Sequence, residues 1–378
     1  MTERIRSKVL VAAIVGCVLT LSGTLGSCQR GTADIKVGAI LGLTGDYAAY
    51  GEKMRRGYEF ALDQVDSAGG VSGRKVVLLA EDSQFDPAKA VTAYQKLYAA
   101  QGVRIYVGIT GSKNALPVCE ASKDDDVVIV DPLGSAPKLT QYGGPNYFRI
   151  MASDALAGKY NVDWAMESGM KRPAIVFMED DWGSSYRDSV VDYLEKKGFA
   201  DTPSLGVLPG TRDFRTEIEK LKASSPDAVF LLLYAKEGSS FMQQLRQAGV
   251  DAQVYGSDNI SATEFVSAGN EVVEGVRVAL PAAAHGPTYD KFVQDYRSKY
   301  SEEPDANVIK SYDAMELVVA AIAEVGTEPS KIKEYFRSPG FEYKGVSGVI
   351  KFDANGDLVS QEYTRMVYRS GTLEPVEG

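Results

Sequence analysis

Residues 104–140 read RIYVGITGSKNALPVCEASKDDDVVIVDPLGSAPKLT, and this stretch decides the fold. Two unbroken, β-branched apolar runs within it, Ile105–Val107 and Val127–Val130, predict buried parallel strands. Each run ends in a turn of small residues, 108–112 after the first and 132–137 after the second. This succession is typical of an open α/β sheet, in which ligands bind beyond the carboxyl ends of the strands.

Each of the two turns carries a serine, Ser112 in the first and Ser135 in the second. Glycine lets a ligand approach the backbone closely, and a serine at a helix start places a hydroxyl beside unpaired N–H groups. If the two strands are neighbours, the turns together can hold a small anionic group, such as a carboxylate, without a basic side chain. From these residues alone, the alternative is that both are ordinary strand-to-helix turns with no role in binding.

Length and composition restrict the class of protein. A chain of 378 residues with 44% hydrophobic content can bury large cores and is expected to form two domains. The net charge of −10 argues against nucleic acid as a partner. His285 is the only histidine, which weakens any proposal of a Ser-His-Asp triad or a histidine-rich metal site.

The first 27 residues have the pattern of a secretory signal. Basic residues precede the apolar stretch Val9–Leu21, which is short for a membrane span. Leu25-Gly26-Ser27-Cys28 then resembles a bacterial lipobox, in which Cys28 becomes the lipidated first residue of the mature chain. We therefore expect a signal peptide over 1–27, a tether over 28–34 and a lipid anchor on Cys28. Simple secretory cleavage nearby is the alternative.

Strand and helix alternate twice along the rest of the chain. The first series has expected strands at 35–41, 76–80, 105–107 and 127–130, and the second has them at 174–178, 204–207, 228–234, 253–256 and 276–280. Helical patterns separate these strands, three further helices follow, and a hairpin of 349–352 with 363–368 around an Asn-Gly turn is expected at the end. The sequence therefore predicts two doubly wound, Rossmann-like α/β lobes with a ligand cleft between them.

Cofactor motifs are missing from the sequence. There is no G-x-x-x-x-G-K-[ST] phosphate loop, and the glycines after the first strand lack the spacing of a dinucleotide fingerprint. The acidic run 353–357 resembles a calcium loop only superficially, because its glycine comes too early. We expect neither a cofactor nor a metal. Cys119 lies in an apolar helical pattern and is expected to be a small core residue, with no internal disulfide.

Three more candidate residues, Trp182, Glu237 and Asp258, lie just past predicted strand ends. Periodicity alone makes each of them a surface or rim residue. The position that they share with the two serines, beyond the ends of strands, is what favours a functional role.

Several short motifs occur in order between residues 34 and 370. They are YG at 50–51, GGVSGRK at 69–75, ED at 81–82, DPAKA at 86–90, FR at 148–149, LRQAG at 245–249 and GVSG at 345–348. Together they resemble the type I periplasmic binding proteins of the leucine/isoleucine/valine group. The resemblance implies a non-enzymatic, ligand-capturing subunit of an ABC importer that works with membrane permease and ATPase subunits.

The resemblance also implies two lobes joined by three hinge crossovers. We place the crossings near 151–153, 280–283 and 345–348. The first lobe is then 35–151 with 283–346, and the second is 152–282 with 347–378.

For the site, the resemblance implies that Ser112 and Ser135 hold the carboxylate of an amino acid. The backbone of Leu133 would accept from its ammonium group, Asp258 would pair with that group, and Tyr50 and Trp182 would form the walls. The chemistry agrees, because a zwitterion needs donors at one end and an acceptor at the other, and buried charge must be paired.

Two departures from the family pattern matter. Phe85 and Gly111 stand where the family often has a disulfide, and both cysteines are absent together. Glu237 stands where a tyrosine is common, so either the ligand has a polar or basic side chain or Glu237 forms an interlobe ion pair.

We therefore expect a monomeric, lipid-anchored protein on the periplasmic or extracellular face. It captures a branched-chain or related amino acid by hinge closure and presents it to a permease. A sensor on the same fold, a binder of an amide, urea or aromatic acid, and a hydrolase are the alternatives.

Overall fold

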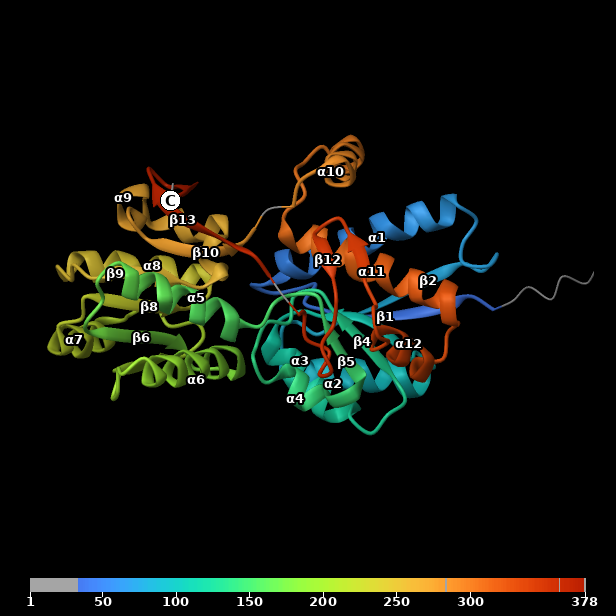
Figure 1. Ribbon diagram of the computed structural model, residues 1–378, viewed down its shortest axis with the longest axis horizontal. Helices are drawn as coiled ribbons and strands as arrows, with labels where there is room; N and C mark the ends of the chain where they lie inside the picture. Colours follow the sequence, from blue (N-terminus) through green and yellow to red (C-terminus); the bar gives the residue numbers. More distant parts are fainter. Residues whose placement is uncertain (1–32, 283, 360, 377–378) are drawn as a thin grey trace, which may run out of the picture. The chain divides into compact units, whose positions relative to one another are not determined.

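Two α/β lobes make up the computed structural model, which describes residues 33–282, 284–359 and 361–376 (Figure 1). The first lobe is built on a five-stranded sheet of order β2-β1-β3-β4-β5. The second is built on a seven-stranded sheet of order β14-β13-β10-β9-β8-β6-β7. The described residues from Ile35 onward belong to one compact unit, which contains both sheets.

All strands of the first sheet run parallel, as their β-branched, unbroken sequences predict. They are β1 (Ile35–Leu41), β2 (Val76–Asp82), β3 (Ile105–Ile109), β4 (Val128–Asp131) and β5 (Tyr147–Arg149). Side chains from one face of the sheet pack with α1 (Ala48–Ser67) and α11 (Ala306–Val325), and those from the other pack with α2 (Pro87–Gln95) and α3 (Ser112–Ser122). The lobe is completed by α4 (Leu139–Gly143), α10 (Pro287–Tyr300) and α12 (Pro329–Phe336).

The second sheet has a parallel part and an antiparallel edge. The parallel strands are β6 (Pro173–Met178), β7 (Ser204–Val207), β8 (Ala228–Leu232), β9 (Gln253–Gly256) and β10 (Arg277–Pro281). The antiparallel strands are β13 (Tyr363–Arg369) and β14 (Thr372–Pro375). The helices of this lobe are α5 (Asp154–Glu167), α6 (Asp181–Lys196), α7 (Arg215–Ser224), α8 (Ala235–Gln247) and α9 (Asn270–Val273).

Side-chain caps fix where several helices begin near the carboxyl ends of strands. Asp86 accepts from the N–H of Lys89, Ser153 from that of Ala155, Asp180 from that of Gly183, and Asp305 from that of Val308. These caps satisfy N–H groups that the first helical turn leaves free. The first three caps therefore fix turns that follow strands, whereas Asp305 fixes the turn between α10 and α11.

The chain passes three times between the lobes. The passages lie between β5 and α5, between β10 and α10, and between residue 358 and β13. The third lies later than the expected 345–348, because β11 (Tyr343–Gly345) and β12 (Gly348–Ile350) stay with the first lobe. Phe352 packs against Phe148, and the Gly356 carbonyl accepts from the N–H of Arg149 at 3.0 Å. We assigned 347–378 to the second lobe. In the structure, the chain enters the second lobe only after residue 358.

The expected terminal hairpin of 349–352 with 363–368 is wrong. The Asn-Gly turn does form, because the Asp353 carboxylate accepts from the N–H groups of Asn355 and Asp357 and a bridge joins Phe352 to Leu358. The strand beyond it, β13, pairs instead with β10 and β14. Local sequence was therefore enough to predict the Asn-Gly turn, but it was not enough to predict which strand pairs with β13.

The two cysteines with expected roles fall in different parts of the chain. Cys119 is fully buried with a free thiol in the core of the first lobe, as predicted. Cys28 and the expected signal peptide lie outside the described residues. Among the helices that the structure describes, none is both long and apolar enough to span a membrane.

Candidate functional site

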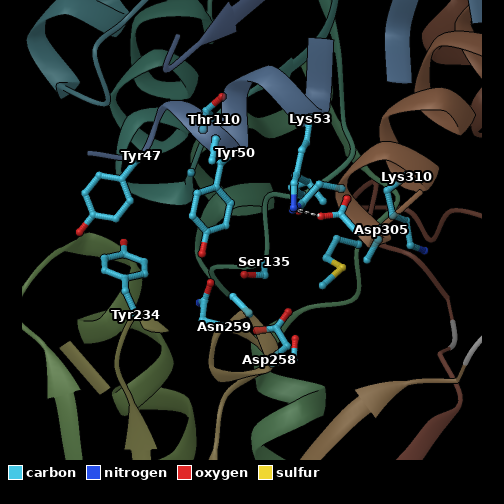
Figure 2. Close-up of a pocket in the computed structure, with 18 of the residues that line it drawn as sticks. Tyr47, Tyr50, Lys53, Thr110, Ser135, Tyr234, Asp258, Asn259, Asp305 and Lys310 are labelled. Atoms are coloured by element: carbon cyan, nitrogen blue, oxygen red, sulfur yellow. Dashed lines mark hydrogen bonds and ion pairs between the residues drawn. The ribbon is translucent and has the colours of Figure 1, made fainter. Parts of the chain in front are cut away.

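A cleft of about 440 Å³ opens between the carboxyl ends of strands from both lobes (Figure 2). Six of the predicted site residues line it: Tyr50, Ser112, Leu133 and Ser135 from the first lobe, and Trp182 and Asp258 from the second. The seventh, Glu237, does not line it. Among the described residues, no group of histidine, cysteine, aspartate and glutamate side chains could hold a metal ion.

The turn after β4 is held rigidly by Asp131, which is fully buried. Its Oδ1 accepts from the N–H groups of Leu133 at 3.1 Å and Gly134 at 3.0 Å, and its Oδ2 accepts from the Tyr147 hydroxyl at 2.8 Å. Burial raises the pKa of Asp131 to about 6. Position 134 must be glycine, because an added Cβ would lie 2.1 Å from the Tyr147 hydroxyl oxygen. The backbone on either side of Gly134 is therefore fixed before any ligand arrives.

Ser112 links the two predicted turns. It is the first residue of α3, and its Oγ accepts from the N–H groups of Ser135 at 3.3 Å and Ala136 at 3.1 Å. A hydroxyl that accepts twice still has its own hydrogen to donate. The turns after β3 and β4 are therefore joined, as predicted for neighbouring strands, with the Ser112 O–H available at the cleft.

An acid that the sequence analysis missed, Asp154, lies behind the cleft surface in contact with Trp182 and Ser135, two residues that line the cleft. Asp154 begins α5, is almost fully buried, and accepts the indole N–H of Trp182 at 2.8 Å on Oδ2. Burial raises the pKa of both Asp154 and Asp258, and the charge of Asp258 raises that of Asp154 further. The two acids therefore lie close enough to interact, and the charge of Asp258 makes Asp154 harder to ionise. One sequence signal could have found Asp154. It is the pair Ser153-Asp154, which is typical of a helix start and lies just past Arg149.

We expect Asp154→Asn to remove a pH-dependent loss of stability in the ligand-free protein. Folding raises the pKa of Asp154 above its ordinary 3.8, so between the two values the folded protein keeps a proton that the unfolded chain releases. Stability from this group is complete at low pH and is lost as the pH rises through the raised pKa. Denaturant unfolding measures the free energy of unfolding at about pH 5 and at about pH 8. Between these pH values it should fall further in the wild type than in the variant, by about 1 kcal/mol or more. Equal losses would contradict this assignment.

One end of the cleft is walled by aromatic rings from both lobes. Tyr47 stacks on Phe85 with centroids 4.3 Å apart, and Tyr234 stacks on Trp182 at 4.9 Å. Tyr47 and Tyr234 meet edge to face at 5.7 Å across the lobes. Of these rings only Trp182 was predicted. Tyr234 is the last residue of the strand expected at 228–234, so its position beyond the strand end was visible in the sequence.

Glu237 lies behind this aromatic end. It is 5% exposed, and its Oε1 accepts from the Gly210 N–H at 3.1 Å and from the Tyr47 hydroxyl at 3.5 Å. The structure therefore places Glu237 against Tyr47, a residue of the other lobe, and not on the cleft surface. An interlobe ion pair does occur next to it, between Lys236 and Asp46 at 3.9 Å.

Phe85 fills the space where a disulfide was noted as absent. An added Cβ on Gly111 would lie 2.5 Å from Cε2 of Phe85, so the ring lies directly against this glycine. Gly111 also has a φ of +82°, which side chains rarely adopt. The two positions where the expected disulfide is absent, Phe85 and Gly111, are thus in direct contact with each other.

The other end of the cleft is polar. Lys53 of α1 pairs with Asp305 at 2.6 Å, and both line the cleft (Figure 2). Lys310 is almost fully buried, donates to the Ile150 carbonyl at 3.0 Å, and has its pKa lowered by burial. Ile150 begins the first passage between the lobes, so this lysine ties α11 to that passage.

Residues 34–372 match the periplasmic binding protein family. The chain belongs to this family. The predicted family and fold class are thereby confirmed, and the protein is a member of a family of binding proteins that are not enzymes. Proteins of this periplasmic family act outside the cytoplasm.

Similar proteins carry names that agree with this membership. A Leu/Ile/Val-binding protein homolog of Brucella melitensis is 27% identical and spans 95% of this chain and 98% of its own. The crystal structure of a leucine-binding protein from Thermotoga maritima is 25% identical, covers 91% of this chain and 98% of its own, and has a TM-score of 0.80. A solute-binding protein of R. palustris, solved with benzoate, has a TM-score of 0.78 at 20% identity over 91% of this chain and 96% of its own, and thus shares the fold.

Proposed function

We propose that this periplasmic binding protein captures an amino acid, branched-chain or related, in the interlobe cleft and delivers it to an ABC importer. The observation that carries the proposal is the arrangement of opposite chemistries on opposite walls. Ser112 and Ser135 of the first lobe offer donors, and Asp258 of the second lobe offers a negative charge to the same cavity. The names of the relatives from Brucella and Thermotoga support an amino-acid ligand.

In this proposal, the ligand carboxylate accepts from the Ser112 hydroxyl and from Ser135. The ammonium group donates to the Leu133 carbonyl and pairs with Asp258. A zwitterion satisfies both walls, and pairing offsets the cost of burying its two charges. Tyr50 and Trp182 then cover the apolar part of the ligand.

Closure of the two lobes is expected from the contacts that both lobes make with the ligand. A ligand held by both lobes stabilises the arrangement in which both contact it, so the empty protein is expected to be more open. Rotation would take place at the three passages between the lobes. With the second lobe turned away, Asp258 and Trp182 would leave the ligand and only the first-lobe serines would remain.

The proposal includes a lipid anchor on Cys28 and a signal peptide over 1–27, both carried by the lipobox-like sequence. An anchored, monomeric protein would hold the ligand close to the permease and ATPase subunits. Fatty-acid labelling of cells that produce the protein tests the anchor. Label that persists in Cys28→Ser would contradict it.

Native mass spectrometry of the purified protein, followed by calorimetric titration, tests the ligand class. We expect an amino acid to be found and to bind, whereas benzoate, simple amides and urea should not, because they lack the ammonium group that Asp258 requires. A bound aromatic acid without an amine would contradict the proposal. Uptake lost on deletion of the gene distinguishes import from sensing.

A further inference from the structure

The aromatic end of the cleft has two partly or fully buried acids behind it. Glu237 lies at the start of α8, and Asp180 precedes α6 with its pKa raised by burial. Within the described part of the chain, Oε2 of Glu237 is buried and accepts no hydrogen bond. A buried carboxylate oxygen without a donor is costly, so a positive charge placed at this end of the cleft would be attracted to Glu237 even without direct contact.

The two tyrosines that separate these acids from the cleft are already used as donors. The Tyr234 hydroxyl donates to Asp180 Oδ2 at 2.8 Å, and the Tyr47 hydroxyl donates to Glu237 Oε1 at 3.5 Å. A phenol has one hydrogen, so each hydroxyl can only accept from a ligand. Figure 2 shows Tyr47 and Tyr234 together at one end of the cleft, to one side of Ser135 and Tyr50. A ligand group that reaches them must therefore donate.

Lys113 is a base that lies beside this cluster, and its charge offsets only part of the negative charge of Asp180 and Glu237. Its Nζ lies 4.3 Å from the centroid of Phe85 and 6.0 Å from that of Tyr47, and burial lowers its pKa. Across the described residues, neither Asp180 nor Glu237 forms an ion pair with Lys113 or with another base. Two acids against one unpaired base leave this end of the cleft negative.

We infer that the ligand is an amino acid with a basic side chain, whose cationic head lies beside Tyr47 and Tyr234 and faces Glu237 and Asp180. The inference rests on the proposed function, because the α-carboxylate and α-ammonium groups must occupy the serines and Asp258. Aromatic faces attract a cation, and the rings here surround the place where the head would lie. A cleft of about 440 Å³ can hold a long side chain.

Matched ligand pairs test this class by calorimetry. L-Arginine and L-citrulline have the same shape but differ in charge, and L-lysine and L-norleucine differ by the terminal ammonium. We expect the wild type to bind the charged member of each pair at least about tenfold more tightly. Glu237→Gln keeps the acceptor for Gly210 and should weaken arginine about tenfold while changing citrulline little. Lys113→Met should strengthen arginine binding, because it removes a competing cation.

Further variants separate this inference from the proposed function. Asp258→Asn should weaken arginine and citrulline alike, and Glu195→Gln, which removes an exposed acid of α6 outside the cleft, should leave their ratio unchanged. Tight norleucine binding with no preference for lysine overturns the inference and leaves the proposed function intact. A preference that survives Glu237→Gln, or weaker arginine binding in Lys113→Met, also overturns it. If no amino acid binds to the wild type, the proposed function itself is wrong.

Discussion

Replacing Asp258 with asparagine is expected to weaken amino-acid binding by roughly a hundredfold or more. The carboxylate lies at the start of the short helix Asp258–Ser261 and faces the cleft, with its pKa raised by burial. Removing one partner of a desolvated charge pair costs about 2–5 kcal/mol, since the other charge is left in a poor solvent. Calorimetric titration of the wild type and the variant with the same amino acid at neutral pH measures the loss.

Two further variants make this result specific. Asp251→Asn removes an exposed acid that precedes the same strand, β9, and should leave the dissociation constant nearly unchanged. In Asp258→Asn the like charge beside Asp154 is gone, so Asp154 ionises more readily and retains part of the attraction. Asp154→Asn combined with Asp258→Asn should therefore bind more weakly than Asp258→Asn alone. An unchanged dissociation constant in folded Asp258→Asn would contradict its pairing with the ammonium group.

The residues that were predictable share one feature, which is their place just past a strand. Ser112, Ser135, Trp182 and Asp258 were found because parallel strands end at one edge of a sheet, so sequence position alone implies proximity. The structure brings all four to one cleft. Tyr234 has the same position after β8 and was missed because it was assigned to the strand itself.

Other residues could not be placed from local sequence. Glu237 also follows β8, but the first turn of α8 directs it behind Tyr47, and helix direction beyond a strand end is set by tertiary packing. Tyr47 lies in the loop before α1, and its contacts with Phe85 and with Tyr234 of the other lobe join segments that are far apart in sequence. The pairing of β13 with β10 joins segments about 85 residues apart in sequence, a separation that periodicity does not encode.

An ion pair between Arg149 and Asp357 lies beside two of the passages between the lobes, and local sequence did not predict it. Arg149, the last residue of β5, has a side chain with no exposed surface. Its Nε lies 2.5 Å from Asp357 Oδ1, and its Nη1 donates to the Ala136 carbonyl at 2.7 Å. Asp357 also accepts from the Thr140 hydroxyl at 3.2 Å. Arg149 therefore joins the serine-bearing turn to the segment that leads into the third passage.

We expect Asp357→Ala to lower the free energy of unfolding by about 3–5 kcal/mol, because it removes the ion-pair partner of the fully buried guanidinium of Arg149. The partners are unequal, since the Asp357 side chain is 26% exposed and that of Arg149 is not exposed at all. Arg149→Met should therefore lower the free energy of unfolding by less than Asp357→Ala does, because water can reach the Asp357 carboxylate that remains. Urea denaturation followed by far-UV circular dichroism measures the two losses.

The combined variant Arg149→Met/Asp357→Ala distinguishes this explanation from a simple loss of contacts. If the cost of Asp357→Ala comes from an unpaired buried cation, removing that cation should recover stability, and the double variant should be more stable than Asp357→Ala alone. Losses that add would mean that the pair contributes only packing. Asp295→Ala breaks the exposed pair with Lys291 on α10 and should change stability far less, which provides the surface comparison. Because Arg149 also donates to Ala136, beside Ser135, ligand affinity should fall together with stability in both single variants.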